Sequence, residues 1–301
     1  MDLFKELCHI TGEENVLRDE PMSRHTTFRI GGPADFFVTP EKKEQIGQVI
    51  ALCRSREIPY YIVGNGSNLL VGDHGYRGVI VQVFKKMNQI HTDGEKLCAQ
   101  AGALLSKVAA AALEASLTGL EFASGIPGTL GGALRMNAGA YGGEMKQVTE
   151  SAQVLTPEGE ILEIPVDELG MSYRTSVISR NDYVVLEAVL KLNRGNREEI
   201  RARMEDLKEK RVSKQPLEYG SAGSTFKRPE GYFAGKLIED AGLRGFRVGD
   251  AQVSEKHCGF VINRGKATAA EVIQLMDQVR ARVKEKFGVE LEPEVKRIGE
   301  F

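Results

Sequence analysis

Apolar positions spaced three and four residues apart predict several helices along the chain. The first begins at Thr39-Pro40, where an N-cap residue precedes a proline, and ends before Pro59. The last opens at Thr268, three residues before Glu271, and stops at Gly288. Two further helices are predicted over residues 106–116 and 198–211.

Short β-branched and aromatic runs between these helices predict strands. A turn at Pro157-Glu158-Gly159 marks a hairpin over residues 154–164, and residues 193–196 form a linker. Because hairpins alternate irregularly with helices, the pattern favours an α+β fold over a doubly wound parallel sheet. The other predicted strands cover residues 60–63, 78–83, 96–100, 183–192 and 258–263.

Length and charge narrow the class of protein. The chain has 301 residues, 42% of them hydrophobic, which is enough for two or more compact cores. Its 40 basic and 42 acidic residues nearly cancel, so no nucleic-acid partner is expected. The four cysteines lie far apart, and no apolar run is long enough for a signal peptide or a membrane span. We therefore expect a cytoplasmic protein without a metal site.

A glycine-rich loop, Gly64-Asn65-Gly66-Ser67-Asn68, follows the predicted strand at 60–63. Its backbone N–H groups and short polar side chains suit a pyrophosphate, because anions bind where several donors converge. The loop is not a dinucleotide fingerprint of the Rossmann type, since Leu69 takes the place of the third glycine and no helix follows. A tight turn between strands is the alternative.

A second glycine-rich stretch, residues 125–143, has too many glycines for a regular element. A flat cofactor can lie against such a small-residue surface, whereas a packing corner between helix and strand explains it without a ligand. Two separate glycine loops together favour a bound dinucleotide.

Three polar side chains stand out for chemistry. Ser224 lies beside glycine and Lys227, but no Gly-x-Ser-x-Gly elbow is present, so a turn or cap is its ordinary role. Glu294 sits in an apolar segment broken by Pro293, where a carboxylate needs a partner or a task. Arg174 can bind a carboxylate with two hydrogen bonds or form a surface ion pair. Composition does not choose among these.

Read in order, six motifs make the chain resemble the UDP-N-acetylenolpyruvoylglucosamine reductases, the MurB family. They are His25-Thr26-Thr27-Phe28-Arg29-Ile30-Gly31-Gly32-Pro33-Ala34, Gly64-Asn65-Gly66-Ser67-Asn68-Leu69-Leu70, the loop from Gly125 to Gly139, Ser172-Tyr173-Arg174, Gly223-Ser224-Thr225-Phe226-Lys227 and Glu292-Pro293-Glu294-Val295. The short C-terminal region is similar to that of the compact type II subclass.

The resemblance implies a two-lobed FAD-binding domain of the vanillyl-alcohol-oxidase (PCMH) type and a C-terminal α+β substrate domain. We place the lobes at residues 1–95 and 96–196, and the substrate domain at 197–301. FAD is then bound noncovalently along its pyrophosphate and ribityl chain. The implied cofactor-binding residues are Gly64, Asn65, Gly66, Ser67, Asn68, Gly125, Ile126, Pro127, Gly128, Gly131, Asn137, Ala138 and Gly139.

The resemblance also implies the reaction: NADPH reduces FAD and leaves, and UDP-N-acetylglucosamine enolpyruvate is then reduced to UDP-N-acetylmuramate. Ser224 becomes the proton donor, while Arg174 and Glu294 stabilise the charged intermediate. We expect Glu294 to be protonated and to donate a hydrogen bond, because an anion beside the substrate carboxylate is unfavourable.

Three basic residues are implied to bind substrate, namely Lys214, Lys227 and Arg228. The family commonly has Lys-Asn-Pro where this chain has Lys227-Arg228-Pro229, which puts an amide contact in doubt. Arg228 then either binds a phosphate or turns outward.

Two other readings stay open on the sequence. One is a different flavin oxidoreductase of the same fold, acting on alcohols, and the other is a flavin- or nucleotide-binding module without catalysis. A monomer is expected, although a nearly neutral surface with scattered apolar residues is also compatible with a dimer.

Overall fold

The computed structural model describes residues 2–301, which form two compact units made of interleaved segments. Unit 1 comprises residues up to Leu17, Phe36–Asn65 and Gly78–Arg211, and unit 2 comprises Arg18–Asp35, Gly66–Arg77 and Val212–Phe301. Residues 18–35 and 66–77, which we assign to the first lobe, thus pack with the C-terminal residues. The boundaries at 95 and 196 stay predictions.

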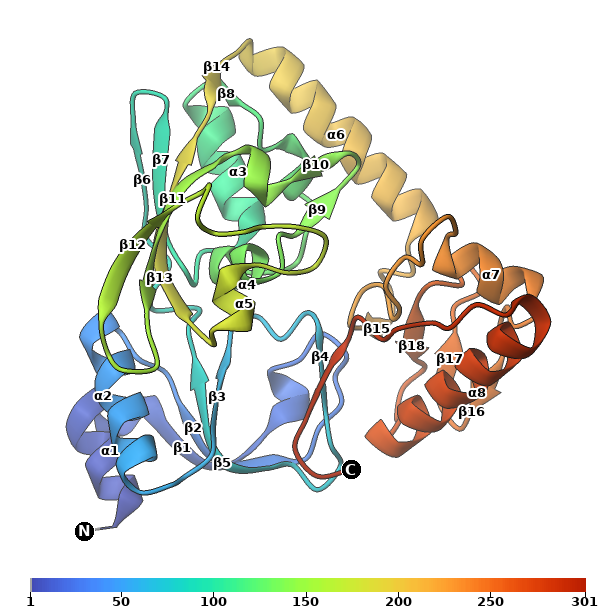
Figure 1. Cartoon of the computed structure of the whole chain (residues 1–301), viewed down its shortest axis with the longest axis horizontal. Coiled ribbons are helices and arrows are strands. Elements are labelled where there is room, and N and C mark those ends of the chain that lie inside the picture. Colours follow the sequence, from blue (N-terminus) through green and yellow to red (C-terminus); the bar gives the residue numbers. More distant parts are fainter. Residues whose placement is uncertain (1) are drawn as a thin grey trace. The chain divides into compact units, whose positions relative to one another are not determined.

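Unit 1 is built around a five-stranded antiparallel sheet in the order β12-β11-β13-β7-β6. Two helices, α3 and α4, pack against it and bury alanine and leucine side chains (Figure 1). The strands are β6 (Ile90–Asp93), β7 (Lys96–Gln100), β11 (Thr149–Leu155), β12 (Ile161–Pro165) and β13 (Val184–Lys191), and the helices of this unit are α3 (Leu105–Glu114), α4 (Leu130–Arg135) and α5 (Val177–Arg180). A further helix, α6 (Arg197–Lys214), belongs to unit 1 up to Arg211 and to unit 2 from Val212.

Most of a second, four-stranded sheet, ordered β1-β2-β5-β3, also belongs to unit 1. Its strands β3 and β5 run parallel, with Val63 opposite Gln82. Leu7 from α1 and Val49 and Cys53 from α2 are fully buried against it. The elements are α1 (Leu3–Thr11), β1 (Val16–Pro21), β2 (Pro33–Val38), α2 (Lys43–Ser55), β3 (Tyr60–Val63) and β5 (Tyr76–Gln82), with the short pairs β8 (Leu117–Thr118) and β14 (Asn193–Arg194), and β9 (Gly139–Ala140) and β10 (Gly143–Glu144).

Unit 2 holds an antiparallel sheet in the order β15-β18-β17-β16, packed against α8 (Figure 1). The chain's last strand runs parallel to β4, with Arg297 opposite Leu70. Its elements are β4 (Leu69–Val71), β15 (Gly220–Ser221), α7 (Ala234–Asp240), β16 (Arg247–Val248), β17 (Ala251–Val253), β18 (Val261–Asn263), α8 (Ala269–Phe287) and β19 (Lys296–Ile298).

Several sequence predictions need correction. The helix expected from Thr39-Pro40 begins at Lys43, because the Gln45 side chain accepts hydrogen bonds from the N–H groups of Glu41 and Lys42 and caps it there. The glycine-rich stretch contains a helix, α4, that buries Leu130, Ala133 and Leu134. The linker at 193–196 includes β14, the strand expected from Cys258 begins at Val261, and helices α1 and α7 were not predicted.

The N-terminus of α8 has an additional cap from a distant loop in unit 2. The Asp73 carboxylate accepts hydrogen bonds from the N–H groups of Ala269 at 2.7 Å and Ala270 at 2.9 Å. Asp73→Ala is expected to lower the free energy of unfolding by about 1–2 kcal/mol, because two orphan donors and a favourable helix-dipole contact are lost. Chemical denaturation of the apoprotein measures the change. Asp277→Ala, on an exposed face of the same helix, is the control and should change stability by less than about 0.5 kcal/mol; equal losses would contradict the capping role.

Candidate active site

The loop from Gly64 to Asn68 links β3 to β4 and presents unbonded donors. Within residues 2–301, the backbone N–H groups of Asn65, Gly66, Ser67 and Asn68 donate no hydrogen bond. Gly66 has φ +61°, and a Cβ there would lie 2.0 Å from the carbonyl oxygen of His25, so only glycine fits. Such a run of open donors is a suitable cradle for a pyrophosphate.

The second glycine loop touches the first inside unit 1. The Asn65 amide donates to the Pro127 carbonyl at 2.6 Å. A Cβ on Gly64 would lie 2.3 Å from Thr129 Oγ1, and one on Gly131 would lie 3.0 Å from Ala101 Cβ. The glycines therefore let two backbone segments and a strand meet at van der Waals distance.

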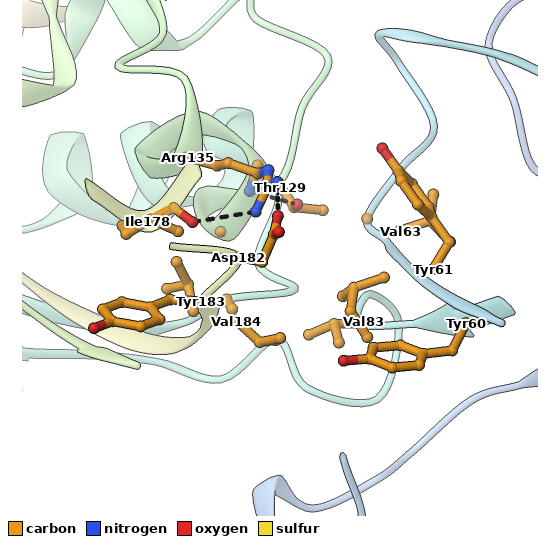
Figure 2. A pocket seen from close by; sticks show the side chains of 16 residues that line it. Tyr60, Tyr61, Val63, Val83, Thr129, Arg135, Ile178, Asp182, Tyr183 and Val184 are labelled. Carbon is orange, nitrogen blue, oxygen red and sulfur yellow. Dashed lines mark hydrogen bonds and ion pairs between the residues drawn. The ribbon is translucent and has the colours of Figure 1, made fainter. Parts of the chain in front are cut away.

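A cavity of about 340 Å³ opens where these segments of unit 1 meet (Figure 2). Gly64 and Gly131 line it, and its size falls within the range of small-molecule sites. The walls are apolar and aromatic, with one charged pair at the edge. The other lining residues are Tyr60, Tyr61, Ile62, Val63, Val83, Ala101, Thr129, Gly132, Arg135, Ile178, Asp182, Tyr183, Val184 and Val185.

The charged pair joins the end of α4 to the turn before β13. Arg135 donates to Asp182 at 3.0 Å and to the Ile178 carbonyl at 3.3 Å. Burial raises the pKa of the Tyr61 phenol. The charge of Arg135 opposes this shift, and the charge of Asp182 adds to it. The phenol therefore stays protonated near neutral pH and can donate a hydrogen bond.

The remaining predicted cofactor residues have varied surroundings. Gly125 lies beside the half-buried Arg211, whose Cδ would be 3.1 Å from a Cβ at that position. Asn137 is buried with φ 44°, and its amide group bonds Glu144 and the N–H of Lys146, so its side chain holds a turn. The other predicted cofactor residues lie on either side of α4: before it Ile126, Pro127 and Gly128, and after it Ala138 and Gly139.

Ser224 and Glu294 lie on neighbouring segments of unit 2. The N–H of Thr225 donates to the Gly259 carbonyl, and its own carbonyl accepts from the N–H of Glu294, both at 2.9 Å. Its Oγ1 accepts a hydrogen bond from the N–H of Val261. Glu294 is only 8% exposed. The side chain is therefore buried rather than solvated, as the apolar segment around it predicts.

Glu294 is also joined to the first glycine loop. The Asn68 amide donates to its carbonyl oxygen at 3.2 Å, within unit 2. The structure thus brings three of the predicted residues, Ser224, Glu294 and Asn68, into one neighbourhood. Arg174 belongs to unit 1, in a turn with φ 56° where its guanidinium lies 5.2 Å from the Tyr173 ring centroid.

The predicted substrate-binding cations differ in their contacts. Lys227 forms an ion pair with Glu292, and Arg228 stacks over the Phe233 ring at 3.7 Å. Lys214 is exposed at the end of α6.

One titratable residue whose pKa the charge of Lys214 affects, His257, was not singled out from the sequence. Burial lowers the pKa of His257, and the positive charge of Lys214 lowers it as well, against the opposing charge of Glu239. Its Nδ1 accepts the N–H of Gly259 at 3.1 Å, so in the neutral ring Nε2 carries the proton. A lone histidine near a glycine gives no sequence signal for this arrangement.

Within residues 2–301, no group of three His, Cys, Asp or Glu side chains is placed to hold a metal ion. No helix of the same residues combines the length and apolar character needed to cross a membrane. The four cysteines are present as thiols, and burial raises the pKa of Cys53 to about 11.

Comparisons with known proteins identify two domains in the chain. Residues 34–165 match a family model described as an FAD binding domain, and residues 215–298 match the C-terminal domain of UDP-N-acetylenolpyruvoylglucosamine reductase. The chain thus combines a PCMH-type FAD-binding domain with a second, reductase-specific domain.

Full-length relatives define the family. A UDP-N-acetylenolpyruvoylglucosamine reductase of Clostridium novyi is 54% identical over 300 residues, covering 100% of this chain and 97% of the relative. One of Clostridium tetani is 55% identical over 299 residues, covering 99% and 97%. The crystal structure of the enzyme (MurB) from Thermus caldophilus superposes with a TM-score of 0.80 at 36% identity, covering 94% of this chain and 98% of that one. The chain belongs to the UDP-N-acetylenolpyruvoylglucosamine reductase family.

Proposed function

We propose that the protein reduces UDP-N-acetylglucosamine enolpyruvate to UDP-N-acetylmuramate with NADPH and bound FAD. This step makes a precursor of peptidoglycan, and we place it in the cytoplasm, carried out by a monomer. The observation that carries the proposal is the 54% identity to a reductase of this name along 300 residues. The open donors at residues 65–68 and the adjoining cavity fit the cofactor independently of that likeness.

When bound, FAD supplies the redox chemistry that carries hydride from NADPH to the substrate double bond. The N–H groups of residues 65–68 would hold its pyrophosphate, and the glycines between Gly125 and Gly139 would leave room for its chain. These donors are fixed by the backbone, so little reorganisation accompanies binding.

The proposed catalytic roles follow from the charge changes in the substrate. Addition of hydride to the methylene carbon moves negative charge toward the carboxylate, which the Arg174 guanidinium stabilises most in the transition state. Ser224 then delivers a proton to the neighbouring carbon. Glu294 is protonated and donates a hydrogen bond, which its burial favours. Lys214, Lys227 and Arg228 bind the anionic groups of the UDP-sugar.

The decisive experiment follows the flavin. Purified protein should be yellow, and NADPH should bleach it under anaerobic conditions. The enolpyruvyl UDP-sugar should then restore the oxidised spectrum, whereas simple alcohols should not. A protein that takes up no FAD, or reduced flavin that this substrate fails to reoxidise, would contradict the proposal. Size-exclusion chromatography with light scattering tests the monomer.

A further inference from the structure

The ion pair between Arg135 and Asp182 lies at the edge of the unit 1 cavity and joins α4 to the turn before β13 (Figure 2). Arg135 ends α4, and its guanidinium reaches both the Ile178 carbonyl and the Asp182 carboxylate. The Ser176 hydroxyl donates to the Arg135 carbonyl at 2.7 Å. The turn at residues 176–182 is thus held to α4 at three points, and the cavity wall at Tyr183 and Val184 follows directly.

The cavity suits the adenosine half of the cofactor. Its walls offer flat apolar surface from Tyr60, Tyr61 and Val184 for a base, and Gly64, where the anion-binding loop begins, lines it as well. None of the proposed catalytic side chains, Ser224, Arg174 or Glu294, lines it, so the reactive ring of the flavin has its place elsewhere.

We propose that Arg135 and Asp182 form a clasp that retains the adenosine half of FAD in this cavity and slows its release. This inference rests on the proposed function, since it takes FAD as the cofactor. Opening of the clasp releases the Asp182 end of the turn, and with it the wall at Tyr183 and Val184 can move away from the base, while the Ser176 hydroxyl still holds the start of the turn to α4.

The exposure of the pair makes the clasp sensitive to salt. The Asp182 side chain is 82% exposed and that of Arg135 is 43% exposed. Ions screen exposed charges, with a Debye length of about 10 Å at 0.1 M and about 3 Å at 1 M ionic strength. FAD release from the wild-type protein should therefore accelerate with added salt, and part of this acceleration should vanish when the pair is removed.

Asp182→Asn tests the clasp, since its exposure leaves folding undisturbed. At low salt we expect FAD to dissociate about two- to fivefold faster, the range that an exposed ion pair supports, as measured by the fluorescence of released flavin. Arg135→Gln should accelerate release further, because the bond to Ile178 is weakened too, and Arg135→Lys should recover part of the retention. Glu150→Gln, which removes the Lys96 ion pair elsewhere in unit 1, is the matched control and should leave the rate unchanged.

A second measurement tests whether the cavity binds the adenosine half of FAD. Apoprotein should bind ADP in competition with FAD, and Asp182→Asn should weaken both by the same factor. Failure of ADP to bind, or an unchanged ADP affinity in the variant, would overturn the assignment of the adenosine half. Equal FAD release rates in Asp182→Asn and wild type, or an equal acceleration by Glu150→Gln, would overturn the clasp. Neither result touches the proposed function, which fails only if the wild-type apoprotein takes up no FAD or does not turn over.

Discussion

Ser224→Ala is expected to reduce turnover of the enolpyruvyl UDP-sugar by at least about 10²-fold while NADPH still bleaches the bound flavin. A positioned acid typically contributes about 10²–10⁴ in rate, and it acts only when the substrate carbon is protonated. Loss of the hydroxyl should not disturb the backbone, because the next residue, Thr225, is held by its N–H, its carbonyl and its Oγ1. Anaerobic stopped-flow spectroscopy of the two half-reactions separates the effects.

The matched control for this variant is Ser221→Ala, in the same segment of unit 2. Its backbone N–H donates to the Thr27 carbonyl at 3.1 Å, and this bond survives the substitution. Turnover of Ser221→Ala should stay within about threefold of the wild type, well below the span of an acid–base effect. Equal slowing of flavin reduction and flavin reoxidation in Ser224→Ala would refute the role of proton donor.

Gly64→Ala is expected to weaken FAD binding by about 10- to 100-fold. The added Cβ would lie 2.3 Å from the hydroxyl and 3.2 Å from the methyl group of Thr129, a residue that is only 3% exposed. Overpacking of this kind costs about 1–3 kcal/mol and displaces the loop at the cavity. Titration of the apoprotein with FAD, followed by flavin fluorescence, gives the dissociation constant.

Two variants show whether the clash is the cause. Thr129→Ala in the Gly64→Ala background removes the two nearest atoms, Oγ1 and Cγ2, leaves Cβ at 3.3 Å, and should recover much of the affinity. Gly47→Ala, in α2, places a Cβ at an ordinary 3.7 Å from Leu155 and should leave FAD binding unchanged while stabilising the helix by about 0.5–1 kcal/mol. If the double variant binds FAD no better than Gly64→Ala, the steric explanation is incorrect.

Helix ends were predictable where the capping residues are adjacent in sequence. Thr268 and Glu271 form the expected capping box, and Gly288 ends α8 with φ 70°. At α2 the visible signal, Thr39-Pro40, misled, because Gln45 caps the helix from within and the Thr39 N–H bonds the distant Asn15 carbonyl. A second cap of α8, from Asp73, comes from 196 residues away and has no local signature.

The same distinction holds for the site. The glycine loops were visible because close approach requires glycine at more than one position of a short segment, as at Gly64 and Gly66. The edge of the cavity could not be predicted, because Tyr61, Arg135 and Asp182 come from three separate segments and none of them is unusual in its local sequence. The glycine count also hid α4, although Thr129 and the apolar side chains after it form an ordinary helix start.

The pairing of β19 with β4 has a consequence for synthesis of the protein on the ribosome. Residues 69–71 leave the exit tunnel more than two hundred residues before their partners at 296–298. During that time one edge of β4, next to the loop proposed to hold the cofactor, lacks its neighbour and is open to pairing with other chains. Nascent chains should therefore acquire flavin only after β19 has left the tunnel, and a stop codon at position 296 should yield aggregated, colourless protein.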